Sequence, residues 1–400
     1  MNIRMSEAIE TLAKPADHPV LFAFDGPQGQ ITGRGAPIPL PRGTSRTLPD
    51  RVARAMATMG DKAILGGALP FDREDEDCLW LCPASEDAGH AASGDPQALP
   101  LRDWDLTAQP AAADYAAAVD HALRIMADEA GKPQALEKIV LARSLLIRAG
   151  ATIPVQALMD RLGADPAVTA FRVTLPARGK DARRVLCGAT PELLLEKRGR
   201  AIASHPLAGS ARRMADEGQD RANATALEQS EKDRREHAFV VEYIMDVLGP
   251  HCRSLSAPAG TTLTHTRSMW HLGTRIEGEL KDPDTPSVVL AGLLHPTPAV
   301  CGAPMRRAYD LIGALEPLPR DFYAGAVGWC DAKGDGAWQV AIRCAQISGA
   351  EARLYAGAGI VPGSDPMAEA AETGAKFGAF LTALGLPLDA GLAGVTKVTE

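Results

Sequence analysis

The sequence lacks the marks of a membrane protein or a secreted protein. Only 4% of its 400 residues are aromatic, and it has no apolar run of about 18 residues, the length that a membrane-spanning helix needs. The first thirteen residues are polar and lack the apolar centre of a secretion signal. We therefore expect a cytoplasmic protein with no membrane partner.

An excess of positive charge is also missing. Lys and Arg number 42 against 50 Asp and Glu, which gives a net charge of −8 at pH 7. Proteins that bind nucleic acid neutralise phosphates with basic side chains, so this balance argues against a nucleic-acid partner. An anionic small molecule is still compatible with it, because a divalent cation or a few basic side chains can reverse the field inside one pocket.

Paired cysteines are absent as well. The seven cysteines are an odd number, are scattered along the chain and include no Cys-x-x-Cys pair. A disulfide framework or a zinc site would need such pairs, so we expect reduced thiols.

What is present is apolar material for a large core, since 46% of the residues are hydrophobic. Up to about residue 105, Pro and Gly separate short apolar segments. This pattern predicts strands such as residues 20–24 and 63–67, and a surface loop at residues 86–100.

Helices and a hairpin are predicted in the rest of the chain. The helices cover residues 111–130, with Asp114 as the cap, then residues 225–248 and 366–384. Residues 326–345 have the pattern of a hairpin around a Gly-Asp-Gly turn. Further strands are predicted at residues 138–147, 170–175, 184–187, 193–197 and 353–356. Hairpins and long helices without a βαβ alternation favour an α+β fold.

Two helical segments carry pairs of carboxylates. Asp233 and Glu236 are three residues apart, as are Glu369 and Glu372, so each pair shares one helix face, and Lys376 follows one turn after Glu372. Two such helices could hold a hard cation such as Mg²⁺. The same spacing is typical of a solvated helix face with ion pairs, and the spacing alone leaves both interpretations open.

Single polar residues interrupt apolar segments at other places. Lys138 opens an apolar strand, Glu192 precedes three leucines, and Arg343 lies within an apolar stretch. Each could mark the solvent end of a strand. If buried, such a group needs a partner or a shifted pKa, which is how acids and bases are made. His271 is open to the same two interpretations, as a core residue or a substrate contact.

Glycines provide a further pattern. Gly357-Ala-Gly359 is predicted to end the strand at residues 353–356, and Gly209-Ser210 follows an earlier strand. Glycine lets a backbone N–H approach an anion closely, although ordinary turns have the same pattern.

Taken in order, these segments resemble the chorismate-utilising enzymes, which include isochorismate synthase, salicylate synthase and the large subunits of anthranilate and aminodeoxychorismate synthase. The matching segments are residues 137–143, 188–195, 205–213, 230–237, 269–272, 294–299, 322–329, 341–344, 355–360 and 369–376. The resemblance covers residues 110–385. It is looser over residues 1–105, where it depends mainly on residues 66–71.

The resemblance implies catalytic roles for two residues. The residue at the position of Lys138 is the general base that activates water in the hydroxyl-transferring members, whereas the ammonia-using members usually have glutamine there. The residue at the position of Glu192 is the general acid that protonates the departing C4 hydroxyl. Lys138 therefore indicates water as the nucleophile.

The resemblance also implies a metal site and a substrate site. Glu236 and Glu372 bind Mg²⁺, with Asp233 and Glu369 close by, and chorismate is the substrate. The residues implied to contact the substrate are Gly209, Ser210, His271, Tyr323, Arg343, Gly359 and Lys376.

For the whole chain, the resemblance implies one α+β domain over residues 1–400. It has two large, mostly antiparallel sheets packed face to face, with flanking helices, and we expect a monomer. Isochorismate synthase of the siderophore type is the preferred activity, supplying 2,3-dihydroxybenzoate or salicylate. Salicylate synthase, which makes isochorismate and then eliminates pyruvate in the same site, is the nearest rival, because the two share nearly all motifs and the lyases also have tyrosine at the position of Tyr323. An anthranilate-type activity, a menaquinone-pathway role and a non-catalytic chorismate-binding regulator are each less favoured.

Overall fold

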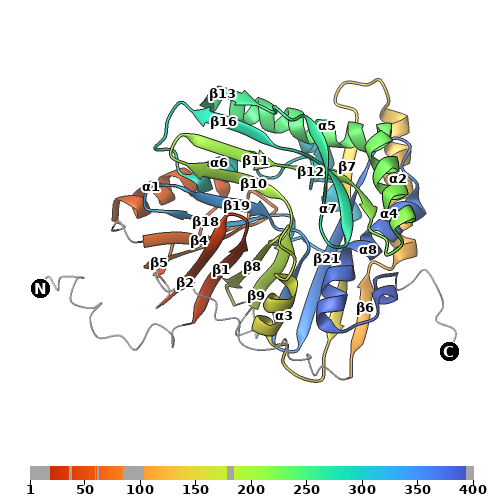
Figure 1. Cartoon of the computed structure of the whole chain (residues 1–400), viewed down its shortest axis with the longest axis horizontal. Coiled ribbons are helices and arrows are strands. Elements are labelled where there is room, and N and C mark those ends of the chain that lie inside the picture. The colour runs from red at the N-terminus through yellow and green to blue at the C-terminus, as the bar shows by residue number, and fades with distance from the viewer. Residues whose placement is uncertain are drawn as a thin grey trace, which may run out of the picture.

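The computed structural model describes residues 19–35, 38–58, 60, 63–83, 103–177 and 184–392, so the predicted loop at residues 86–100 lies outside the described residues. Its strands form three antiparallel sheets (Figure 1). The strands of the first sheet are β1 (Val20–Gly26), β2 (Gly29–Arg34), β6 (Asp105–Gln109), β7 (Lys138–Arg148), β8 (Thr169–Leu175), β9 (Arg184–Thr190), β17 (Gly302–Ala303), β20 (Cys344–Ser348) and β21 (Glu351–Ile360). Their order is β17-β7-β21-β20-β9-β8-β1-β2, and β6 also pairs with β7.

The second sheet is also nine-stranded, and the third has three strands. The second contains β3 (Ile38–Pro39), β4 (Ala63–Leu69), β5 (Cys78–Pro83), β10 (Leu193–Arg198), β11 (Ala201–His205), β13 (Cys252–Ser256), β16 (Ile276–Leu280), β18 (Ala326–Asp331) and β19 (Gly336–Val340). Their order is β13-β16-β11-β10-β19-β18-β4-β5-β3. The third contains β12 (Leu207–Arg212), β14 (Thr261–His265) and β15 (Met269–Thr274).

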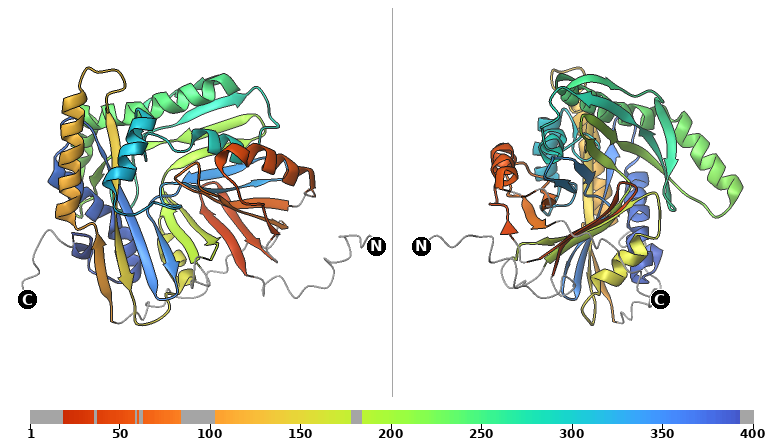
Figure 2. Two further views of the ribbon diagram at one scale, coloured as in Figure 1. Left: turned by 180° about the vertical axis from the view of Figure 1, so that it is seen from behind. Right: turned by 60° about the vertical axis from the view of Figure 1, so that its left-hand side comes forward.

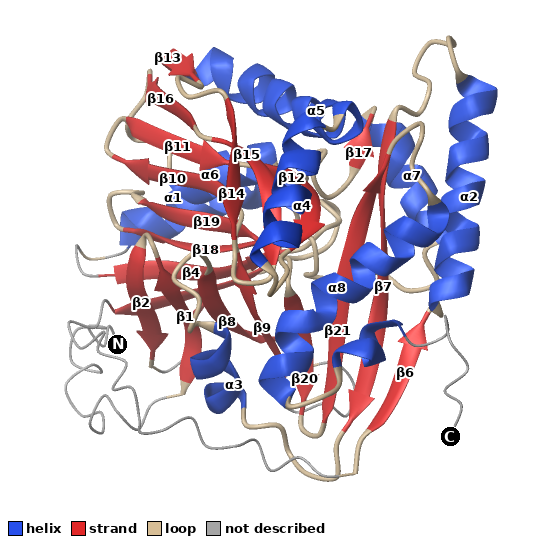
Figure 3. Ribbon diagram, turned by 45° about the vertical axis from the view of Figure 1, so that its right-hand side comes forward, coloured by secondary structure: helices blue, strands red, loops and turns tan. Residues whose placement is uncertain are grey.

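Eight α-helices of the described chain flank the sheets (Figures 2 and 3). They are α1 (Leu48–Thr58), α2 (Ala112–Glu129), α3 (Val155–Leu162), α4 (Glu217–Gln229), α5 (Glu231–Leu248), α6 (Ser287–Leu294), α7 (Met305–Leu315) and α8 (Pro366–Leu384). Short 3-10 turns are η2 (Ser45–Thr47), η3 (Gly249–His251) and η4 (Leu388–Leu392). Of these helices, none is long and apolar enough to cross a bilayer.

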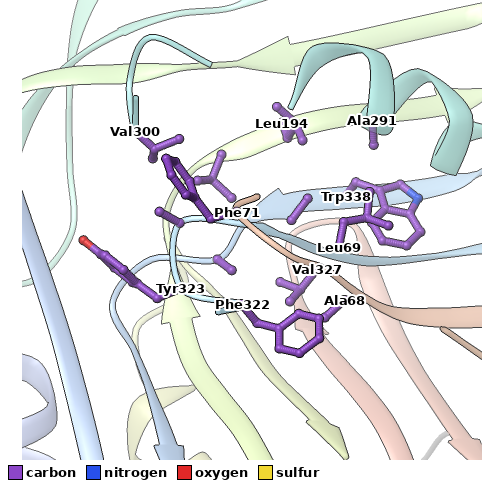
Figure 4. Packing of buried hydrophobic residues seen from close by; sticks show 14 of the residues in the cluster. Ala68, Leu69, Phe71, Leu194, Ala291, Val300, Phe322, Tyr323, Val327 and Trp338 are labelled. Carbon is purple, nitrogen blue, oxygen red and sulfur yellow. The ribbon is translucent and has the colours of Figure 1, made fainter. Parts of the chain in front are cut away.

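One hydrophobic cluster joins the two large sheets. It includes Phe22 and Ile139 from the first sheet and Leu65 and Trp338 from the second, all fully buried. Figure 4 shows part of this cluster, with Trp338 and Phe322 inside it, whereas the hydroxyl of Tyr323 points away from it. The predicted α+β fold with two large antiparallel sheets is confirmed, and the third sheet was not predicted.

A second cluster lies on the other face of the first sheet. There Leu145 and Ile147 of β7 pack with Leu158 of α3 and with Phe377 and Leu381 of α8. Because β7 is covered on both faces, its sequence is a nearly continuous apolar run without the alternation of a half-exposed strand. The polar Lys138 at its start is therefore buried and is not a solvent-facing strand end.

The predicted helix at residues 225–248 is wrong in one respect, because two helices replace it. Ser230 has φ −68° and ψ 112°, which is extended backbone, and it separates α4 from α5. Its Oγ accepts a hydrogen bond from the N–H of Asp233 at 3.2 Å, so it is the N-cap of α5. The carboxylates of Asp233 and Glu236 consequently lie in the first two turns of a new helix.

Two more predictions of detail are wrong. Asp114 does not cap α2; the N-cap is Ala111, without a side-chain bond, and Asp114 lies in the first turn, where its charge favours the helix dipole. Gly357 and Gly359 do not end a strand, since both lie within β21 and pair with β7.

The predicted hairpin is present as β18 and β19, but its second arm is shorter than expected. The chain leaves β19 after Val340 and enters the first sheet at Cys344. Arg343, at the crossing, has φ 49°, a left-handed conformation that is unusual for a residue with a side chain. All seven cysteines are buried free thiols, in agreement with the sequence.

Candidate active site

A small pocket of about 70 Å³ lies where β7, β21, β12, α5 and α8 meet. Most of the predicted site residues line it. They are Glu192, Gly209, Ser210, Glu236, His271, Tyr323, Arg343, Gly359, Glu372 and Lys376. The other three predicted residues, Lys138, Asp233 and Glu369, do not line the pocket surface.

Glu192 lies between β9 and β10 and is only 3% exposed. Burial raises the pKa of its carboxyl group to about 8, and the N–H of Leu207, with the charges of Lys138, Lys376 and Arg343, opposes this shift only partly. At neutral pH the group is therefore mainly a neutral carboxylic acid, which can give a proton to a bound molecule.

Lys138 is fully buried behind the carboxylate of Glu236. Its Nζ lies 3.2 Å from Glu236 Oε1 and donates a hydrogen bond to the carbonyl oxygen of Glu236 at 3.3 Å. Burial lowers the pKa of this amine, while the negative charges of Glu236 and Glu192 act in the opposite direction. The amine is thus close to the pocket wall and easier to deprotonate than a lysine in water.

The carboxylates of α5 and α8 converge on one side of the pocket. Glu372 Oε1 lies 2.6 Å from Lys376 Nζ and accepts a hydrogen bond from Ser210 Oγ at 2.8 Å. Burial alone would raise the pKa of Glu372, but Lys376 holds it below its usual range. Burial and the charge of Glu372 together raise the pKa of Glu369, against the attraction of Lys232. The pKa of Asp233 is raised by burial, with help from Glu236 and Glu372.

The donor chemistry of this side of the pocket suits a hard divalent cation. As they stand, no three His, Cys, Asp or Glu side chains of the described chain form a ready-made metal-binding group. Instead, lysine amines pair with three of the four carboxylates: Lys138 with Glu236, Lys376 with Glu372, and Lys232 with Glu369. The negative charges of Glu236 and Glu372 nevertheless help to raise the pKa of Asp233, and that of Glu372 helps to raise the pKa of Glu369, so this is a region where a cation would be stabilised.

Two glycines make room for these carboxylates. A Cβ on Gly359 would lie 1.9 Å from Glu236 Oε1, and a Cβ on Gly209, which has φ 73°, would lie 2.9 Å from Asp233 Cβ. Any side chain at these positions would displace the acidic groups. The backbone is therefore shaped around the carboxylates of α5, which supports the fit of a cation there.

The other side of the pocket is cationic. Arg343 is 8% exposed, and its guanidinium makes no ion pair or hydrogen bond with any side chain among the described residues. Burial lowers the pKa of this group, although a guanidinium stays charged at neutral pH. Tyr323 lies beside it and stacks on Tyr355, with ring centroids 4.8 Å apart and planes 8° apart. A buried cation without a partner is suited to a ligand carboxylate.

His271 presents an acceptor to the pocket. Its Nδ1 lies 3.4 Å from the carbonyl oxygen of Gly209, so Nδ1 carries the proton, and its buried Nε2 has no hydrogen-bond partner. Burial first, and then the charges of Arg343 and Lys376, lower its pKa well below the usual range. The ring is therefore neutral, and Nε2 can accept a hydrogen bond from a ligand hydroxyl.

Sequence reasoning assigned no role to two residues of this region. Tyr355 belongs to a matching motif, but nothing in the sequence indicated that its ring supports Tyr323. Lys232 looked like part of a solvated helix face, yet its Nζ lies 2.6 Å from the buried carboxylate of Glu369. The contact joins residues 137 positions apart, so no local pattern could have shown it.

The chain is similar to known proteins over most of its length. Residues 84–385 match the family described as chorismate binding enzyme. The chain is 39% identical to the isochorismate synthase EntC of Escherichia coli K12, over 81% of each chain. It is 36% identical to the vibriobactin-specific isochorismate synthase of Vibrio cholerae, over 82% of this chain and 81% of the other. The structure of the menaquinone-specific isochorismate synthase MenF from Escherichia coli superposes with a TM-score of 0.74 at 26% identity, covering 95% of this chain and 92% of that one.

Proposed function

The chain belongs to the chorismate-binding enzymes, and we propose that it is an isochorismate synthase, an isomerase that moves a hydroxyl group from C4 to C2 of chorismate. The observation that carries this proposal is the placement of a neutral acid, Glu192, in the pocket wall and of a buried amine, Lys138, directly behind the wall residue Glu236. An exchange of hydroxyl groups needs one group that takes a proton and one that gives a proton.

In the proposed reaction, the oxygen of a water molecule forms a bond with C2 while the bond between C4 and its hydroxyl breaks. Lys138 takes the proton of the attacking water, and Glu192 gives its proton to the departing oxygen, which leaves as water. The ring double bonds shift, and one water enters for each that leaves. His271, neutral and with a free Nε2, is suited to accept a hydrogen bond from a hydroxyl of the ring.

The proposal includes Mg²⁺ held by Glu236 and Glu372, with Asp233 and Glu369 nearby. When bound, the ion would balance the charge of the substrate's ring carboxylate and fix the ring between base and acid. Lys376 and the backbone at Gly209 and Gly359 lie on the same side of the pocket.

The second carboxylate of the substrate is assigned to the cationic side of the pocket. Arg343 provides the charge, and Tyr323 provides a hydroxyl that points away from the core (Figure 4). The protein would act as a monomer in the cytoplasm, without nucleic acid or a membrane as a partner.

Supply of 2,3-dihydroxybenzoate or salicylate for a siderophore is the proposed role of the product. Among the solved structures, that of a putative 2,3-dihydroxybenzoate-specific isochorismate synthase from Bacillus anthracis superposes with a TM-score of 0.82 at 36% identity, against 0.74 and 26% for the menaquinone-specific structure. Sequence identity alone does not separate the two roles, because the putative isochorismate synthase MenF of Mycobacterium tuberculosis is 41% identical to this chain. Salicylate synthase is the second candidate, because Tyr323 places a hydroxyl at the pocket where a lyase could use it.

Glu192→Gln tests the proposed acid. Glutamine keeps the shape of the side chain but cannot give a proton, so kcat for isochorismate formation should fall by about 10²–10⁴-fold with little change in KM for chorismate. The matched control is Glu196→Gln on the neighbouring strand β10, where the partly exposed carboxylate pairs with Arg198. A Glu192→Gln enzyme with the native kcat would exclude Glu192 as the acid.

A further inference from the structure

Lys232 connects the two helices that carry the carboxylates. It lies in the first turn of α5, and its Nζ donates a hydrogen bond to Glu369 Oε1 on α8 at 2.6 Å. Among the described residues, this contact is the only ion pair or hydrogen bond between α5 and α8. The lysine side chain is 33% exposed and that of Glu369 is 2% exposed, so the amine reaches from the surface into a buried acidic region.

The lysines of this region differ in what holds them. Lys138 also donates to the carbonyl oxygen of Glu236, and Lys376 donates to that of Gly357 at 2.9 Å, so both have a place in the pocket wall. Within the described part of the chain, the amine of Lys232 has no hydrogen bond or ion pair besides that with Glu369. Glu369 is therefore the group that holds the amine of Lys232 in place, as a carboxylate would hold a bound metal ion.

Lys232 is the cation paired with Glu369, which also has a hydrogen bond with the side chain of Ser364. A buried carboxylate needs a cation or a proton, and Glu372, one turn further along α8, adds repulsion. An ammonium 2.6 Å away satisfies one oxygen of Glu369. Lys376 lies equally close to Glu372, but its Nζ also donates to the carbonyl oxygen of Gly357, so it can release Glu372 to a metal and stay bound, whereas Glu369 is the one partner of Lys232 Nζ among the described residues. A divalent ion with few protein ligands would then be limited to the remaining carboxylates.

We propose that Lys232 takes the place of a second cation: it ties α5 to α8, keeps Glu369 out of the metal's ligands, and thereby limits the site to one divalent ion at Glu236 and Glu372. This inference rests on the proposed function, since it assumes the metal. Lys232 is therefore a positioning residue, which acts through Glu369 without touching the substrate.

The test measures how many Mn²⁺ ions the full chain binds without substrate. Electron paramagnetic resonance gives the concentration of free Mn²⁺, and the bound ion is the difference from the total. The native protein and the Lys232→Arg control, which keeps the charge, should each bind one Mn²⁺. Lys232→Met should bind a second Mn²⁺, and the double variant Lys232→Met/Glu369→Gln should lose it again. A Lys232→Met protein that binds one Mn²⁺ with the native Kd would overturn the proposal.

Glu369→Gln gives a second test that does not depend on the folding of Lys232→Met. It leaves the charge of Lys232 unbalanced near the remaining site, so the Kd for Mn²⁺ should rise by about tenfold. An unchanged Kd would contradict the proposal. Native protein that binds no Mn²⁺ and forms no isochorismate would instead refute the proposed function, so the two failures can be distinguished.

Discussion

Glu192 and Lys138 owe their chemistry to burial. Both were identified from the sequence as polar residues beside apolar runs, and the resemblance assigned their roles. The sequence could not show that the pKa of Glu192 lies near 8, because this value depends on Leu207, Lys376 and other groups that the fold brings together. Nor could it show that Lys138 lies behind Glu236, a contact between residues 98 positions apart.

The raised pKa of Glu192 predicts a pH dependence of stability. Its folded value, about 8, exceeds the ordinary value of 4.5, so between these values the folded state holds a proton that the unfolded state has lost. The free energy of unfolding should therefore fall as pH rises from about 4.5 to 8, by up to about 1.4 kcal/mol per pH unit from this group, and then level off. Urea unfolding of native protein and Glu192→Gln across this range measures the difference. Parallel curves would show that Glu192 does not titrate in this way.

At the scale of elements, the strands and helices that the sequence predicted are present, whereas the helices α1, α3, α6 and α7 and the strands β13 to β16 were not predicted. The junctions between elements were not predicted either. The strand at residues 138–147 and the helix at residues 366–384 have strong patterns, and both appear in the structure. Ser230 splits a helix that looked continuous, because a local serine cap competes with helix propagation. At Arg343 the chain passes from the second sheet, through β19, to the first sheet, through β20. No local sequence pattern shows which sheet a strand joins.

The pairing of β21 with β7 fixes the backbone of Gly359 beside Glu236. We therefore predict that Gly359→Ala inactivates the enzyme. The added methyl group would lie 1.9 Å from Glu236 Oε1, so the carboxylate must move away from the pocket. Isochorismate formation should fall by about 10²-fold or more, since a misplacement of about 1 Å can have such an effect. The matched control is Gly313→Ala in α7, where the methyl group meets nothing within 4 Å. Native rates in both variants would contradict the geometry given for Glu236.

At the scale of the molecule, the N-terminal part of the chain is divided between the two large sheets. β1 pairs with β8 of the first sheet, and β4 pairs with β18 of the second. The sequence showed a looser resemblance over residues 1–105 and gave no sign of this division. One domain over residues 1–400 stays a prediction, supported by a hydrophobic cluster that includes residues from Leu21 to Ala370.

Calorimetry of the full chain tests that prediction. If the N-terminal strands are part of a shared core, unfolding should give one heat-absorption peak, with equal calorimetric and van't Hoff enthalpies. A separate peak for the first 105 residues, identified by limited proteolysis between the peaks, would divide the chain into two domains.

The central claim is that this pocket converts chorismate to isochorismate and releases it. The most direct measurement is to incubate the purified protein with chorismate and Mg²⁺, with an EDTA control, and to separate the products. We predict that isochorismate accumulates only with the metal, and that neither salicylate nor pyruvate forms. Equal amounts of salicylate and pyruvate would contradict the synthase assignment in favour of a lyase that uses Tyr323, and no turnover, even with ammonia supplied, would contradict the assignment as an enzyme.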